Sequence, residues 1–159
     1  MQTAGRLLAL LLLTAPLAAQ PVAYDVSWPR AAAHETEIAA TFSGLDAAPL
    51  AVVMSQSSPG RYAIHQFAKN VFAVSATDGA GRPLPVARVT PSEWSVGGHD
   101  GTVTFRYTLY SNRADGTYAG VDSTHAHYNM PAAFVWARGL EARPVRLTVH
   151  PVHGWRVAT

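Results

Sequence analysis

The sequence has 159 residues, no cysteine, and 12 basic against 10 acidic side chains. Eleven of the twelve basic residues are arginines scattered along the chain. This scatter argues against nucleic-acid binding, which requires a basic patch. Without cysteine, thiol catalysis and a disulfide framework are excluded, so packing alone must hold the fold.

Residues 1–19 have the pattern of a secretory signal peptide. An apolar run from Leu7 to Leu13 follows Arg6, and small residues that suit cleavage come next. The run is too short to span a bilayer of roughly 30 Å as a helix. We therefore expect a periplasmic or secreted protein in which residues 20–159 form a single domain, with no stable membrane span after signal cleavage.

The chain after residue 20 has the period of β-strands. Apolar and polar residues alternate in residues 34–42, 102–110 and 145–150, as in strands with one buried face and one wet face. Residues 49–54 are apolar throughout and predict a strand covered on both sides. Turn residues separate these runs, so the sequence predicts an all-β fold, an antiparallel β-sandwich of about eight or more short strands.

The stretch 57–70 connects two of these strands. Pro59 and Gly60 predict a structural type II turn, because proline fixes φ and glycine accepts a positive φ. At most a short helical turn is expected near residues 62–70. The loop is expected to be held on the sandwich by Tyr62, Ile64 and Phe67, with His65 and Lys69 on its solvated side.

The sequence contains no catalytic constellation. A zinc-peptidase helix needs His-Glu-x-x-His, but His34-Glu35 is followed by Ile38 and lies in a predicted strand. No nucleophile or carboxylate adjoins His65, as a catalytic histidine would require. We therefore predict no catalytic residue in this chain.

One pair of histidines could hold a metal. His125 and His127 project on the same side if residues 121–130 are extended, and Zn or Cu normally takes three or four ligands. The set would be completed by Asp122, His150 or His153. The alternative interpretation is that both histidines form hydrogen bonds within an interface.

The order of several motifs carries a family resemblance. An early strand from Tyr24 to Trp28 precedes His34, the turn at Pro59–Tyr62, a hairpin at residues 76–84, and the segment 115–139. Over residues 22–159 this order resembles the amino-terminal domain of the glycyl aminopeptidase family, peptidase family sixty-one. Members of that family are secreted or periplasmic zinc metallopeptidases of bacteria.

The resemblance implies a non-catalytic domain that is truncated at its C-terminal end. The family's catalytic domain, which carries the His-Glu-x-x-His helix and the zinc, is absent, so no cofactor is expected here. The expected partners are that catalytic domain and, by way of it, a peptide substrate. A domain separated from such a partner should expose an apolar patch. Candidates for the substrate cleft or the domain interface are Tyr62, His65, Thr124, His125, His127 and Asn129.

Two other functions stay open at this point. The first is a free-standing secreted β-sandwich binding module with a metal site at His125 and His127. The second is a carbohydrate-binding sandwich, which needs exposed aromatic residues on one face. The four tryptophans are dispersed along the sequence, and core packing is their expected use.

Overall fold

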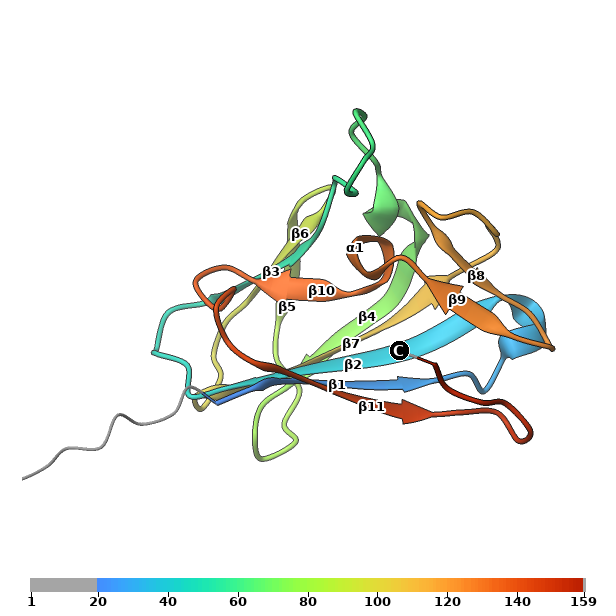
Figure 1. Ribbon diagram of the computed structural model, residues 1–159. Helices are drawn as coiled ribbons and strands as arrows, with labels where there is room; N and C mark the ends of the chain where they lie inside the picture. Colours follow the sequence, from blue (N-terminus) through green and yellow to red (C-terminus); the bar gives the residue numbers. More distant parts are fainter. Residues whose placement is uncertain (1–19, 159) are drawn as a thin grey trace, which may run out of the picture.

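The computed structural model describes residues 20–158, where eleven strands form two facing sheets and one hairpin (Figure 1). The larger sheet has the strand order β11, β1, β2, β7, β4. The bounds of these strands are, in the same order, Val145–His150, Val22–Ser27, Glu35–Ser43, Thr102–Tyr110 and Val71–Thr77. The predicted all-β sandwich is confirmed.

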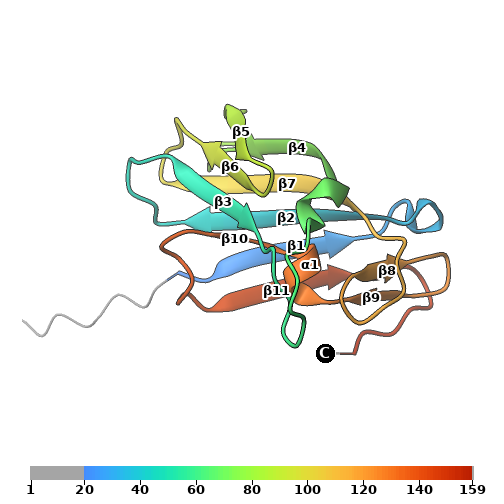
Figure 2. The same ribbon diagram turned by 90° about the horizontal axis from the view of Figure 1, so that it is seen from above.

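The smaller sheet has the strand order β10, β3, β6, β5. Its strands are, in the same order, Val135–Ala137, Leu50–Met54, Glu93–Val96 and Val86–Thr90. The hairpin pairs β8, Ala119–Val121, with β9, Ala126–Tyr128. It lies at one end of the sandwich, beside the short helix α1, Met130–Ala133, and far from β5 (Figures 1 and 2).

The central pair of the larger sheet follows the predicted alternation. Strands β2 and β7 pair antiparallel over their whole length, with Ile38 opposite Tyr107 and Ala40 opposite Phe105. Every second residue of both strands is buried. Because successive side chains of a strand point to opposite faces, this register places one apolar row of each strand in the interior.

The interior lies between the two sheets. Phe42 and Phe105 of the larger sheet and Val52 of the smaller one have no solvent exposure. The Trp94 ring of β6 lies 5.6 Å from the Phe105 ring across the interior. Strand β3 is buried at every position except Ala51, as the apolar run 49–54 predicted.

Two buried tyrosines tie the larger sheet to α1 and β10. The Tyr24 hydroxyl donates to the carbonyl of Val135 and the Tyr107 hydroxyl to that of Ala133, both at 2.7 Å. Burial raises the pKa of Tyr24 to about 12 and raises that of Tyr107 still further. Both phenols therefore remain protonated and donate at neutral pH.

One strand pair departs from the predicted antiparallel arrangement. Strand β11 returns to the free edge of β1 and pairs with it in parallel, Val22 opposite Val145 and Ser27 opposite His150. The alternation of residues 145–150 predicted a strand but contained no information about its partner or direction. Figure 1 shows β11 as the outermost strand beside β1.

The predicted turn and helical turn are both present. Gly60 has a φ of +73°, and the Arg61 amide donates to the Ser58 carbonyl at 3.1 Å, as in a type II turn with Pro59 before Gly60. The helical turn is η2, Phe67–Asn70. Two further short turns, η1 at Ala31–Ala33 and α1, were not predicted, because three or four residues leave no helical stripe in a sequence.

The expected anchors of the stretch 57–70 are confirmed only in part. Phe67 is buried at 1% exposure, but Tyr62 is exposed at 105% and Ile64 at 82%. The prediction that Tyr62 and Ile64 pack on the sandwich is therefore wrong. The His65 amide closes the base of the loop on the Gln56 carbonyl at 2.8 Å, so the residues between them project outward (Figure 1).

The predicted signal peptide, residues 1–19, lies outside the described residues. Across residues 20–158, no helix has the length and apolar character needed to cross a membrane.

Candidate functional site

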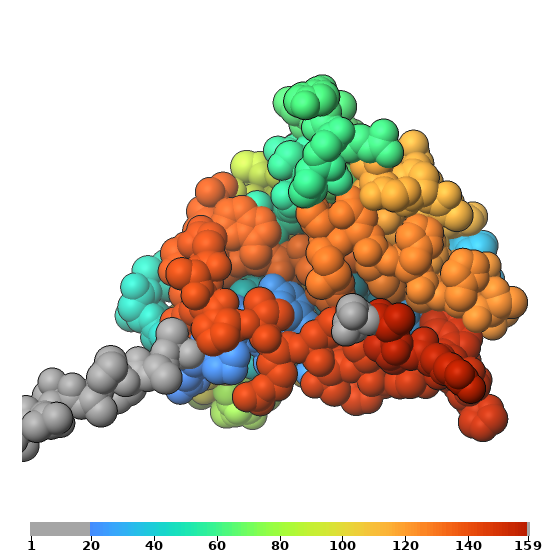
Figure 3. Space-filling view, viewed as in Figure 1, coloured from blue at the N-terminus to red at the C-terminus, as the bar shows by residue number. Residues whose placement is uncertain are grey.

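An apolar groove runs along the side of the sandwich between the hairpin and β11. Its volume is about 600 Å³, and most of its exposed lining is apolar. Figure 3 shows this face, with α1 and β9 above and β11 and residues 151–158 below. The lining residues are Val26, Trp28, Ala126, His127, Tyr128, Met130, Phe134, Leu147, Val149, Pro151, Trp155, Arg156, Val157 and Ala158.

Aromatic rings from three distant parts of the sequence form the floor of the groove. The Trp28 ring lies 6.2 Å from the Tyr128 ring and 5.4 Å from the Trp155 ring. The Tyr128 ring in turn lies 6.3 Å from that of Phe134. Two of the four tryptophans that are dispersed in the sequence, Trp28 and Trp155, therefore meet here.

The polar atoms beneath the groove are paired with one another. The Trp28 indole N–H donates to the Tyr128 hydroxyl, which lies 2.6 Å from the Thr36 hydroxyl. Because the indole can only donate, the Tyr128 hydroxyl is free to donate to Thr36. Burial raises the pKa of Tyr128 to about 12, so this group is neutral at physiological pH. Trp28 and Tyr128 therefore present apolar ring surface to the groove, because their polar atoms are already paired.

Strand β11 forms one wall of the groove and is mostly uncovered. The sequence predicted a buried apolar face for residues 145–150, but Val145 is 63% exposed and Leu147 is 37% exposed. This prediction is wrong for Val145 and Leu147, whereas Val149 on the same side is partly buried and packs against the core. The predicted alternation of β11 is therefore present, but its apolar side is covered only in part.

The six candidate residues lie in two segments, 57–66 and 124–129. These segments meet through Asn129. Its side-chain amide donates to the Ser58 hydroxyl at 2.8 Å and to the Thr117 carbonyl at 2.7 Å. Ser58 and Thr117 are both buried. Both amide hydrogens are thus used internally, so Asn129 joins three chain segments rather than facing a ligand.

His65 is part of an aromatic stack. Its ring lies 4.9 Å from the Phe67 ring in a nearly parallel orientation, and its Nδ1 is 3.4 Å from the Tyr118 hydroxyl. Its Nε2 is buried without a hydrogen-bond partner in the described part of the chain. The expectation that His65 lies on the solvated side of the loop is wrong, because Phe67 and Tyr118 cover it. Lys69, by contrast, is exposed as expected.

The turn of the hairpin is organised by Asp122. Its Oδ1 accepts from the Thr124 amide and hydroxyl, both at 2.6 Å, and from the His125 amide at 3.0 Å. These hydrogen bonds, those from Thr124 first, hold the pKa of the Asp122 carboxyl well below its usual range. Thr124 and His125 are both exposed at this hydrogen-bonded turn.

The His125 and His127 rings lie side by side, as the sequence predicted for an extended segment. The ring centroids are 6.5 Å apart, and the ring planes are nearly parallel. The His127 ring packs on Gly120, where a Cβ would come within 2.6 Å of it. Residues 20–158 contain no group of three or more His, Cys, Asp or Glu side chains able to hold a metal. His150 instead lies 3.2 Å from Asp25 on another strand.

The groove contains only one of the residues singled out from sequence, His127. Tyr62 projects from the loop, and Thr124 and His125 lie at the hairpin turn. Sequence reasoning missed Trp28 and Trp155 as groove residues. The signal in the sequence is the apolar side of residues 145–150, whose alternation by itself predicts a core face.

Comparison with known proteins finds a matching family model and a solved structure with a similar fold. The model of the Peptidase M61 N-terminal domain family matches residues 23–159. No curated protein matches the chain. The crystal structure of an aminopeptidase N family protein from Idiomarina loihiensis superposes with a TM-score of 0.77 at 22% sequence identity. The match covers 81% of this chain and 22% of that one, so the chain spans about a fifth of its neighbour's length.

Proposed function

This chain belongs to the Peptidase M61 N-terminal domain family, and from that membership we propose that it is the non-catalytic amino-terminal domain of a secreted zinc aminopeptidase of the glycyl aminopeptidase type. In this proposal the domain packs on the catalytic domain and helps to shape the cleft for the peptide. Zinc and the bond-breaking step belong to the catalytic domain.

The observation that carries the proposal is the uncovered groove beside β11. Soluble monomers rarely leave a large apolar hollow open, and such surfaces mark sites of interaction. Leu147, Val157 and Met130 are large apolar residues around it that are 37%, 53% and 52% exposed. The last described part of the chain lies along the same groove, which is lined by Pro151, Trp155, Arg156, Val157 and Ala158.

The polar candidate residues of the segments 57–66 and 124–129 suit a supporting role at the cleft. Asn129 and His65 are held in internal contacts, so we assign them to the shape of the wall. Tyr62, Thr124 and His125 are the exposed candidates for contact with the peptide or the catalytic domain. Tyr62 is the most accessible of the three, because its whole side chain stands clear of the loop.

The first experiment tests the absence of catalysis. The purified chain, supplied with zinc, should release no glycine or alanine from small peptides. Turnover that persists through repeated purification would refute the non-catalytic role.

The nucleotide sequence after codon 159 should continue into a reading frame with His-Glu-x-x-His, and a stop codon there would contradict the proposed parent enzyme.

The second experiment tests the docking face in the longer protein with its catalytic domain. Leu147→Asp places a charge in the groove and should weaken the contact between the domains, measured as faster limited proteolysis between them and reduced peptide turnover. Val89→Asp is the matched control, because Val89 is 55% exposed on β5 in the smaller sheet and does not line the groove. Equal effects of the two substitutions would refute the groove as the docking face.

The third experiment concerns Tyr62. In the longer protein, Tyr62→Ala should raise KM for the peptide, while the melting temperature stays the same because the side chain is fully exposed. Thr90→Ala, at an exposed position of β5, serves as the control. An unchanged KM would remove Tyr62 from the cleft.

A further inference from the structure

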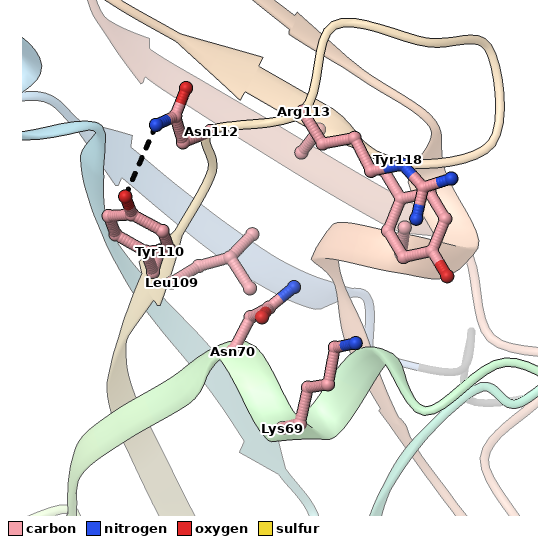
Figure 4. Close-up of a pocket in the computed structure, with 9 residues that line it drawn as sticks. Lys69, Asn70, Leu109, Tyr110, Asn112, Arg113 and Tyr118 are labelled. Carbon is pink, nitrogen blue, oxygen red and sulfur yellow. Dashed lines mark hydrogen bonds between the residues drawn. The ribbon is translucent and has the colours of Figure 1, made fainter.

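A second hollow lies on the other side of the hairpin from the groove. It is lined by β8, β7 and η2, whereas the groove is lined by β9. Its volume is about 190 Å³, which is room for a small ion with several atoms. Figure 4 shows Lys69 and Asn70 rising toward it from η2, with Asn112 on one side and Arg113 and Tyr118 on the other.

Each polar side chain that lines this hollow carries at least one hydrogen-bond donor. Lys69 and Arg113 contribute cations, and Asn70 and Asn112 contribute side-chain amides. The hydroxyls of Tyr110 and Tyr118 can donate as well. No carboxylate is among the lining residues, and Leu109, Ala119 and Ala132 complete the lining with apolar surface.

The Arg113 guanidinium is held in position from two sides. Its Nε lies 2.7 Å from the Asp115 carboxylate, and its central carbon lies 3.9 Å from the centre of the Tyr118 ring. The Tyr118 ring packs edge-on against the buried Phe67. The two terminal nitrogens of Arg113 have no hydrogen-bond partner within residues 20–158 and are available to a ligand. A guanidinium fixed in this way loses little side-chain entropy when it binds.

Lys69 adds a charge that no acidic group neutralises. It is the only lysine of the chain, and its ammonium group has no ion pair in the part of the chain that the structure describes. Asn112 is oriented by its amide, which donates to the Tyr110 hydroxyl at 3.2 Å. Two cations and two amides therefore surround one hollow. Asp115, which pairs with Arg113, does not line it, and Lys69 has no acidic partner within residues 20–158.

We propose that this hollow is a binding site for an oxyanion, a carboxylate or a phosphate group. Paired donors on Arg113 match the two oxygens of such a group, and Lys69 supplies a point charge. The group can belong to a free small anion or to an acidic side chain of the proposed catalytic domain. The site itself depends on neither choice and does not rest on the proposed function.

The experiment is a calorimetric titration of the purified chain at pH 7 with inorganic phosphate and, separately, with acetate. Ionic strength is kept constant with chloride, so that general screening does not change during the titration. Saturable binding at one site is expected. Lys69→Met should weaken it about tenfold or more, since a charge-assisted hydrogen bond is lost.

The matched control is Arg61→Met, which removes one exposed cation from the projecting loop. Arg61 does not line the hollow and has no ion pair within residues 20–158, so its loss should leave the dissociation constant unchanged. Equal weakening by Lys69→Met and Arg61→Met, or no saturable binding to the wild-type chain, would overturn the proposal. Thermal unfolding of both variants verifies that each is folded.

A titration of the longer protein distinguishes the two sources. If phosphate still binds there with the same dissociation constant, the natural ligand is a free anion. If phosphate binds the isolated chain but not the longer protein, and Lys69→Met weakens the contact between the domains, the ligand is a carboxylate of the catalytic domain. Loss of phosphate binding in the longer protein with no effect of Lys69→Met on that contact would overturn the second source.

Discussion

The sandwich interior and the groove beside β11 contain the same kinds of side chain, but only the interior is closed. Phe105 and Val52 are covered by the facing sheet and have no exposure. Leu147 lies on a strand with an equally regular alternation and is 37% exposed. Alternation therefore identifies the apolar side of a strand, whereas a second layer decides whether this side is buried.

The largest expected effect tests this contrast directly. Phe105→Ala should lower the free energy of unfolding by about 3–5 kcal/mol, because it leaves a cavity between two packed sheets. Leu147→Ala should cost less than about 1 kcal/mol in the same chain, because the side chain is already partly in water. Urea unfolding of both variants measures the difference. Similar losses would show that the groove is closed in solution.

The next prediction concerns the attachment of the loops to the closed body. Asn129→Ala should cost about 2 kcal/mol, because the buried Ser58 hydroxyl and Thr117 carbonyl each lose a partner. Amide exchange in residues 57–66 should accelerate more than in β2. Asn112→Ala is the control, since Asn112 is exposed and bonds only to an exposed hydroxyl. An equal cost for both asparagines would contradict the role assigned to Asn129.

A smaller loss in the free energy of unfolding is expected at Thr36, where the interior meets the floor of the groove. Thr36→Val should cost about 1–2 kcal/mol, because the hydrogen bond between Thr36 and Tyr128 is lost at a fully buried position. Thr41→Val removes a comparable bond to Thr104 on the outer face of the larger sheet, where water can replace it, so its cost should be lower. Denaturation midpoints compare the two variants, and a larger cost for Thr41→Val would reverse this expectation.

The smallest expected effect is a pH dependence at the hairpin turn. The pKa of Asp122 is lowered in the folded chain, so its carboxylate favours folding above the unfolded pKa of about 4, and this contribution is lost as the pH falls. Asp122→Asn should therefore be less stable than wild type at pH 7, and the difference should shrink below about pH 4. Melting temperatures measured across this range test the sign, which a constant difference would contradict.

The sequence was sufficient for the class of fold and for its most regular parts. The alternation in β2 and β7 and the apolar run of β3 gave the buried faces, because the period of a strand is fixed by its backbone geometry. Pro59 and Gly60 gave the turn, because their own φ restrictions specify it. The order of motifs also indicated the family, which the match of the family model to residues 23–159 confirms.

Local sequence patterns did not predict most of the candidate site. Trp28, Tyr128 and Trp155 are far apart in sequence, and their contact depends on the hairpin and on the return of β11 to β1. The sequence alone predicts a solvated His65, because its contacts with the nearby Phe67 and with Tyr118, more than fifty residues later, depend on how the loop folds back. Long-range contacts of this kind have no local pattern.

The sequence by itself therefore determined what each segment can be: strand, turn, apolar side or polar side. These properties follow from backbone geometry and side-chain chemistry within a few residues. Only the tertiary structure decided which apolar side stays open and which donors surround one hollow. Strand pairing and sheet packing bring together residues whose separation along the chain leaves no trace in the local sequence.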